Sequence, residues 1–137
     1  GFRAFLFLAD LGVSWYTMVG LLWTEESERR FAIMMKMTFV FDNNRLLQTG
    51  KTADEVIEPM RDHAKKWHID EVAPYQFEKD GKDALCDLFM FIPEILEKDK
   101  SYYTYFSKWY VEQNGQFYED CIEGSKDALA VMERNNA

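Results

Sequence analysis

The dipeptide formed by Asn114 and Gly115 constrains the fold more than any other feature of this sequence. Both residue types accept the positive φ angles of a type I′ turn, which joins two antiparallel strands through a two-residue loop. Aromatic and β-branched residues, which strands favour, flank the dipeptide on both sides. The sequence therefore predicts a β-hairpin, and a two-residue loop pairs Val111 with Tyr118.

Side chains of the predicted hairpin alternate between two faces. One face carries Tyr105, Trp109, Val111, Tyr118 and Ile122, and the other carries Lys108, Tyr110, Glu112, Phe117 and Glu119. Only one face can pack on a small core, so we expect Tyr110 and Phe117 to be exposed and framed by two glutamates. Aromatic anchors with a polar rim are typical of protein interfaces. The candidate interaction surface consists of Tyr110, Glu112, Phe117 and Glu119. The alternative is that these aromatic residues serve ordinary core and cross-strand packing.

The rest of the chain alternates between strand and helix patterns. Residue types and periodicity predict strands at 38–41 and 72–78, and helices at 53–67, at 83–96 and from Ser125 onward. The most regular apolar stripe lies on the second helix and consists of Leu85, Leu88, Phe89, Ile92, Ile95 and Leu96. The predicted fold is a single α+β domain of order β-α-β-α-β-β-α, with a mostly antiparallel sheet and helices on one face.

Polar residues and prolines set the expected element boundaries. The Asp-Asn-Asn side chains at 42–44 predict a turn after the first strand. Thr52 and Glu55 have the spacing of a capping box, so the first helix begins there. Pro59 removes one backbone hydrogen bond within that helix, which either bends the helix or marks the start of its regular part.

Composition and charge limit the classes of partner. A chain of 137 residues is long enough for one hydrophobic core, and its 47% of hydrophobic residues supplies the apolar surface. The net charge of -8 repels phosphate backbones and anionic lipids, so we expect no nucleic-acid or membrane partner. A basic protein partner fits this charge better. Alternatively, the acidity only keeps an aromatic-rich protein soluble.

The two cysteines, Cys86 and Cys121, lie in separate predicted elements and form no CxxC motif. This spacing indicates neither a zinc cluster nor a thioredoxin-type redox pair. Two reduced thiols, together with the lack of a glycosylation acceptor and of a clean secretory signal, favour a reducing cytoplasm. A single disulfide between the two cysteines is the alternative.

Residues 1–33 form an apolar and charged leader ahead of the domain expected at 34–137. Asp10 disfavours a membrane-spanning helix. A secretory signal is also disfavoured, because its basic start would be a single Arg and no A-x-A-like cleavage site follows. A methionine cluster opens the expected domain, and Arg29 and Arg30 can be encoded by the purine-rich sequence that recruits bacterial ribosomes. We therefore expect the leader to be translated upstream sequence. The alternative is an N-terminal helix that packs on the core.

No complete motif for catalysis, metal binding or nucleotide binding is present. The Gly-Lys-Thr segment at 50–52 resembles the end of a P-loop, but Arg45 stands where that motif needs glycine. A turn followed by a helix cap explains the segment better. His63 and His68 are five residues apart, which on a helix turns them about 140° from each other, so they should not share a metal.

Three residues are candidates for chemistry in a ligand pocket: His63, Asp62 and Cys86. Asp62 precedes Lys66 by four residues, a spacing that favours a solvated ion pair. Cys86 lies at the edge of the apolar stripe with no activating group, which is typical of a structural thiol. We therefore expect no catalytic residue, no cofactor and no metal ligand.

The sequence favours a small acidic, non-enzymatic module for protein binding or regulation. The alternative is a small enzyme or ligand-binding domain with a pocket between the helices and the sheet. A flat aromatic patch on the hairpin would favour the first function, and a deep pocket with a polar floor would favour the second. The sequence does not fix the oligomeric state.

Overall fold

The computed structural model describes residues 33–136 of the chain. The predicted leader at 1–33 lies outside this range except for Ile33. The described elements, in chain order, are β1 (Met34–Phe41), α4 (Asn43–Thr49), α5 (Ala53–Trp67), β2 (Asp70–Ala73), β3 (Gln76–Asp80), α6 (Ala84–Phe89), α7 (Phe91–Lys98), the 3-10 helix η1 (Tyr102–Tyr105), β4 (Phe106–Gln113), β5 (Gln116–Asp120) and α8 (Cys121–Asn136).

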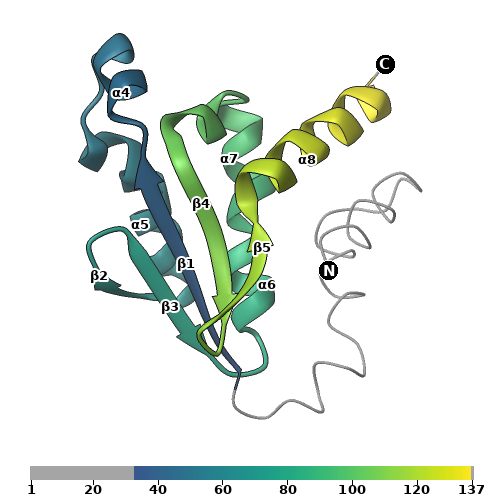
Figure 1. Ribbon diagram of the computed structural model, residues 1–137. Helices are drawn as coiled ribbons and strands as arrows, with labels where there is room; N and C mark the ends of the chain where they lie inside the picture. The colour runs from purple at the N-terminus through teal and green to yellow at the C-terminus, as the bar shows by residue number, and fades with distance from the viewer. Residues whose placement is uncertain (1–32, 137) are drawn as a thin grey trace.

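The strands form one five-stranded antiparallel sheet in the order β2-β3-β1-β4-β5. Helices α5, α6 and α7 lie behind this sheet in Figure 1, and α8 follows directly from β5. The predicted α+β class and the predicted antiparallel sheet are confirmed. Strand β1 is central in the sheet, so one of its faces lies against the core and the other lies on the opposite surface of the sheet.

Alternation along β1 explains why the helices cover only one face. Met35, Met37 and Phe39 are buried toward the helices, whereas Val40, on the other face, is exposed. The strand was expected only at 38–41, but it begins at Met34. The methionines pack into the core even though methionine is not a typical strand former, since burial against neighbouring strands overrides intrinsic propensity.

The core under the sheet is built from aromatic rings. Phe39 contacts the rings of Phe77, Phe91, Phe106 and Trp109, with centroids 5.1 to 6.4 Å apart. Ring pairs at these separations add favourable packing beyond the area they bury. Half of the aromatic cluster between 102 and 118 is therefore buried in the core: these members are Tyr102, Tyr105, Phe106 and Trp109.

Two of the expected turns and strands differ from their predictions. The side chain of Asp42 accepts hydrogen bonds from the backbone of Asn44 and Arg45, so the expected turn at 42–44 is the N-cap of α4. The expected strand at 72–78 is a hairpin of β2 and β3, because the chain reverses at Tyr75, whose φ is 64°. Pro74 suits the first central position of this turn, but tyrosine rarely adopts positive φ at the second, so the reversal was not predicted.

The last two helices also begin at unexpected residues. The predicted helix at 83–96 is divided into α6 and α7, since Pro93 has no N–H to bond the carbonyl of Phe89. Helix α8 starts at Cys121 rather than at Ser125. The Asp120 side chain accepts from the Ile122 backbone and caps this earlier start.

The first long helix follows its prediction closely. Helix α5 begins after Thr52, whose hydroxyl accepts a hydrogen bond from the Glu55 backbone at 3.2 Å. Pro59 lies inside the helix, which continues to Trp67.

No helix among residues 33–136 has the length and apolar character needed to cross a membrane.

Candidate functional site

The β4–β5 hairpin carries the surface that the sequence singled out. Asn114 and Gly115 have φ angles of 50° and 82°, as the predicted two-residue turn requires. The register differs from the prediction beyond the turn: Val111 pairs with Glu119, not with Tyr118. A β-bulge inserts one extra residue in β5 and shifts the pairing.

The bulge changes how the four predicted surface residues lie. Phe117 pairs with Glu112 and is 69% exposed. Tyr110 is half-buried, and it pairs with Thr38 on β1. Glu112 is half-buried and forms an ion pair with Lys36 at 3.8 Å. Glu119 is half-buried opposite the core residue Val111, so the bulge takes it out of simple alternation with Phe117. Phe117 is thus the most exposed of the four.

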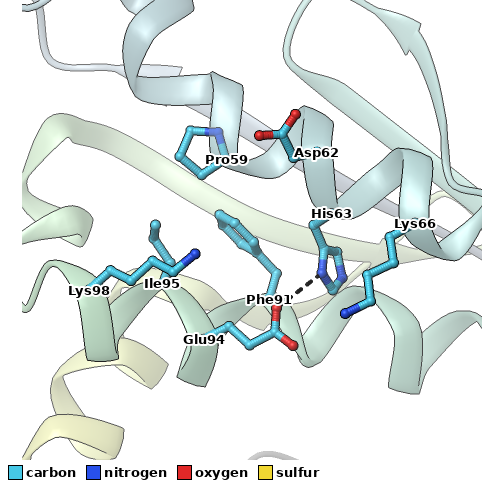
Figure 2. Close-up of a pocket in the computed structure, with 8 residues that line it drawn as sticks. All are labelled: Pro59, Asp62, His63, Lys66, Phe91, Glu94, Ile95 and Lys98. Carbon is cyan, nitrogen blue, oxygen red and sulfur yellow. Dashed lines mark ion pairs between the residues drawn. The ribbon is translucent and has the colours of Figure 1, made fainter.

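A pocket of about 300 Å³ lies between α5 and α7 (Figure 2). Each helix contributes four residues at relative positions 0, 3, 4 and 7, which is the spacing of one helix face. The lining residues are Pro59, Asp62, His63 and Lys66 from α5, and Phe91, Glu94, Ile95 and Lys98 from α7. Two of the three residues that the sequence offered for a ligand pocket, Asp62 and His63, lie here, and Cys86 does not line it.

His63 lies deep in this pocket, and only 2% of its side chain is exposed. Its Nε2 lies 2.5 Å from the backbone oxygen of Asp87, at the end of α6. A carbonyl oxygen only accepts hydrogen bonds, so Nε2 carries the proton that it donates to Asp87. This hydrogen bond fixes the orientation of the ring and leaves Nδ1 toward the pocket.

Nδ1 of His63 lies 3.5 Å from a carboxylate oxygen of Glu94, the contact marked by a dashed line in Figure 2. The two groups are within range of an ion pair, but their geometry does not make a hydrogen bond, and Nδ1 has no hydrogen-bond partner among residues 33–136. Most buried polar atoms are hydrogen-bonded. A buried ring nitrogen without such a partner marks this pocket as a place where a ligand atom would be accommodated.

An ion pair between Lys79 and Asp87 positions the residue whose carbonyl orients His63. Lys79 of β3 contacts the carboxylate of Asp87, and it also donates to the carbonyl of Trp67 at 2.6 Å. One lysine thereby links the sheet to the ends of α5 and α6. The His63 ring is positioned by elements that pack on the rigid core, as a binding site requires.

The pocket has groups for proton transfer but no hydroxyl or thiol among its lining residues. A histidine held by a carbonyl and facing a carboxylate is suited to accept or donate a proton. The sequence signal for this site was available in the matched 0, 3, 4, 7 spacing on the two helices. It was missed because the sequence alone does not show that these two helix faces pack against each other.

The other candidate residues have structural roles. Burial raises the pKa of the Cys86 thiol to about 12, so it is protonated and weakly nucleophilic at neutral pH. Neither Cys86 nor Cys121 forms a disulfide. His68 ends α5 in a left-handed conformation, away from the pocket lining. Within residues 33–136, no group of three or more His, Cys, Asp or Glu side chains is arranged to hold a metal ion.

The segment that resembles a P-loop is a helix connection. Gly50 ends α4 with a φ of 68°, and Thr52 caps α5. The ammonium group of Lys51 binds the hydroxyl of Tyr105 at 3.1 Å, and this hydrogen bond is the main cause of a raised pKa at Lys51. The lysine is engaged with the protein itself, which agrees with the turn and cap expected from the sequence.

Comparisons with known proteins identify no relative: no family model matches the chain, and no curated protein or solved structure matches it.

Proposed function

We propose that this protein is a small binding module that recognises a basic protein partner through the outer face of the β4–β5 hairpin. The single observation that carries the proposal is the exposure of Phe117, at 69%, on the face of the sheet that also carries Glu112 and Lys36, opposite the core. A phenylalanine left in water loses the favourable free energy of burial, and a partner that covers it recovers that free energy.

The surroundings of Phe117 support a protein interface. Val40 is also exposed on this face, and Tyr110 lies half-buried on it. Aromatic side chains that are partly packed at their base lose little conformational freedom when a partner binds, so they are efficient anchors. Glu112 and Asp120, which pair with Phe117 and Tyr110 in the sheet, supply a polar rim.

The charges favour a basic partner over nucleic acid. Lys36, a central cation of this face, is paired with Glu112 and lies opposite Glu78 in the sheet. Its charge is therefore partly neutralised, and the chain as a whole carries a net charge of -8. Phosphate contacts dominate nucleic-acid affinity and need unpaired cations. A partner with lysine or arginine around an apolar groove would complement the face.

The reduced thiols support a reducing compartment, and we propose the cytoplasm as the site of action. The alternative function, a ligand pocket beside the helices, is favoured by one specific observation, the buried Nδ1 of His63 in the pocket between α5 and α7. The two functions use different surfaces and are compatible in one protein.

The test is capture of a partner by the full chain, followed by identification of the bound protein and measurement of its affinity with purified components. Phe117→Ser should weaken binding by about 30-fold or more, since central aromatic anchors contribute ~2 kcal/mol or more. Glu112→Gln should weaken it less and reduce its salt dependence.

Leu47→Ser is the matched control, because Leu47 is 81% exposed on α4, outside the hairpin. It should leave affinity unchanged. Equal losses for Leu47→Ser and Phe117→Ser would contradict the proposal, because they would indicate nonspecific hydrophobic capture. A partner without basic residues would also contradict the proposal, as would tighter binding to DNA or RNA than to the partner protein.

A further inference from the structure

The pocket between α5 and α7 combines an apolar floor with cationic ends. Phe91 and Ile95 are buried in the floor, and the Phe91 ring packs on His63 with centroids 5.6 Å apart. Lys66 and Lys98 line opposite ends, and Figure 2 shows both ammonium groups turned toward the middle of the pocket. A ligand here would contact an aromatic ring and cations at the same time.

The two lysines remain available for a ligand. Neither Lys66 nor Lys98 forms an ion pair with a residue in 33–136; Lys66 lies over the ring of Trp67, 5.7 Å from its centroid. Asp62, the nearest carboxylate on α5, points away from His63 in Figure 2. Glu94 is the one carboxylate lining the pocket that faces His63.

Nδ1 of His63 lies in the pocket together with the two lysines. The Nε2 proton is committed to Asp87, so Nδ1 faces the Glu94 carboxylate either as a lone pair or as an N–H group. Nδ1 has no hydrogen-bond partner among residues 33–136, so it is open to a ligand atom in either form. The two ammonium groups beside it favour a ligand with a negative charge.

We propose that this pocket binds a small apolar carboxylate, with its apolar body on Phe91 and Ile95 and its carboxylate among His63, Lys66 and Lys98. A volume of about 300 Å³ holds roughly ten waters at ~30 Å³ each, which suits a body of one ring or one short branched chain. Inorganic phosphate would leave the apolar floor unused. A neutral ligand would leave the two ammonium groups without a charged acceptor.

The site differs from the helix-terminus sites that commonly hold anions. Its donors are side chains from the middle and end of two packed helices, and the His63 ring is fixed by the hydrogen bond to Asp87. Because the ring is oriented before the ligand arrives, little ordering cost is added on binding. Affinity should therefore depend on the charges of Lys66 and Lys98 and on Nδ1 of His63. Mutations can test these contributions separately.

The experiment titrates the full chain with 3-phenylpropionate, its neutral analogue 3-phenylpropanamide, and inorganic phosphate, followed by amide chemical shifts in NMR spectra. The acid should bind with a dissociation constant on the order of 1 mM, as its size allows, and should shift amides at 59–66 and 91–98. The amide and phosphate should each bind about tenfold more weakly, because the amide lacks the negative charge and phosphate lacks the apolar body.

The variants separate charge from structure. His63→Gln can keep a donor to the Asp87 carbonyl while removing Nδ1, and Lys66→Met and Lys98→Met remove one exposed charge each. Each variant should weaken binding of the acid by about three- to tenfold. Lys65→Met is the control: Lys65 is exposed on α5 and outside the pocket lining, so affinity should not change.

Four results would overturn the proposal. They are equal binding of the acid and the amide, tighter binding of phosphate, shifts confined to other elements, and no saturable shift at roughly ten times the expected dissociation constant. If His63→Gln lowers the melting temperature strongly, the two lysine variants decide the outcome, because both lysines are exposed and should not affect the fold.

Discussion

The bridge from Lys79 to Asp87 and Trp67 is the interaction whose removal should have the clearest consequence for stability. The side chains of Lys79 and Asp87 are 19% and 10% exposed. Lys79→Met keeps the apolar stem but leaves the Asp87 carboxylate without a cation and the last carbonyl of α5 without a donor. Removing one partner of a fully buried ion pair costs ~3 to 5 kcal/mol, and partial exposure lowers this to about 2 to 3 kcal/mol.

A double-mutant cycle isolates the pair. Asp87→Asn leaves Lys79 bound to the Trp67 carbonyl, so it should cost less, about 1 to 2 kcal/mol. The double variant should lose less than the sum of the single losses, by roughly 1 to 2 kcal/mol, because its buried carboxylate is gone. Urea unfolding followed by tryptophan fluorescence measures all four proteins, and unchanged m-values would show that the unfolded state is not altered.

Lys82→Met is the control for loss of a lysine, because Lys82 is exposed in the turn after β3. It should change the free energy of unfolding by no more than about 0.5 kcal/mol. Single losses that add to within ~0.5 kcal/mol would refute the reasoning, as would a Lys79→Met loss no larger than that of the control.

Three further predictions concern the core, the thiols and the chain boundary. Leu88→Ala and Ile92→Ala should each cost ~2 to 5 kcal/mol in urea unfolding, since both side chains are fully buried; losses below about 1 kcal/mol at both would be inconsistent with that. Burial raises the pKa of Cys86 to about 12 and that of Cys121 well above 9.0, so iodoacetamide at pH 8 should label both far more slowly in the folded than in the unfolded chain, as counted by mass spectrometry. Unfolded thiols ionise first, so stability should fall as pH rises from about 9 toward 12. Residues 34–137 should melt cooperatively by calorimetry without the leader, and aggregation that only the full chain prevents would count against this.

The features that sequence predicted correctly are those in which local chemistry and packing agree. The turn at Asn114 and Gly115, the cap at Thr52 and the buried stripe of Leu88 and Ile92 all appear in the structure. In each case one residue type satisfies a backbone requirement or a helical period, and the tertiary fold adds to that preference. The α+β class followed from these elements.

The features that were missed depend on tertiary context. The reversal at Tyr75 uses a residue that seldom adopts positive φ, and its carbonyl accepts a hydrogen bond from Phe39 on the central strand. The bulge in β5 likewise has no residue signature. The reversal at Tyr75 is tied to a strand far away in the sequence, which a local pattern does not contain.

The candidate sites show the same division. Exposure of Phe117 was predicted from alternation in one hairpin, which is local information. The pocket at His63 needed the packing of α5 against α7, and the orientation of its ring needed a carbonyl from α6. Sequence identified the histidine as a candidate but not the glutamate and lysine that complete its surroundings.

The two proposed sites lie on opposite sides of the sheet, and one strand connects them. The floor residue Phe91 packs against Trp109 of β4, with ring centroids 6.2 Å apart, and the next residue, Tyr110, lies on the outer face. Tightly packed cores resist small deformations, so a ligand that fills a preformed pocket should not move β4. Partner affinity should therefore be independent of carboxylate binding, and His63→Gln should leave it unchanged. A dependence between the two sites would require β4 to have two arrangements, because coupling at a distance needs an element whose equilibrium both sites shift.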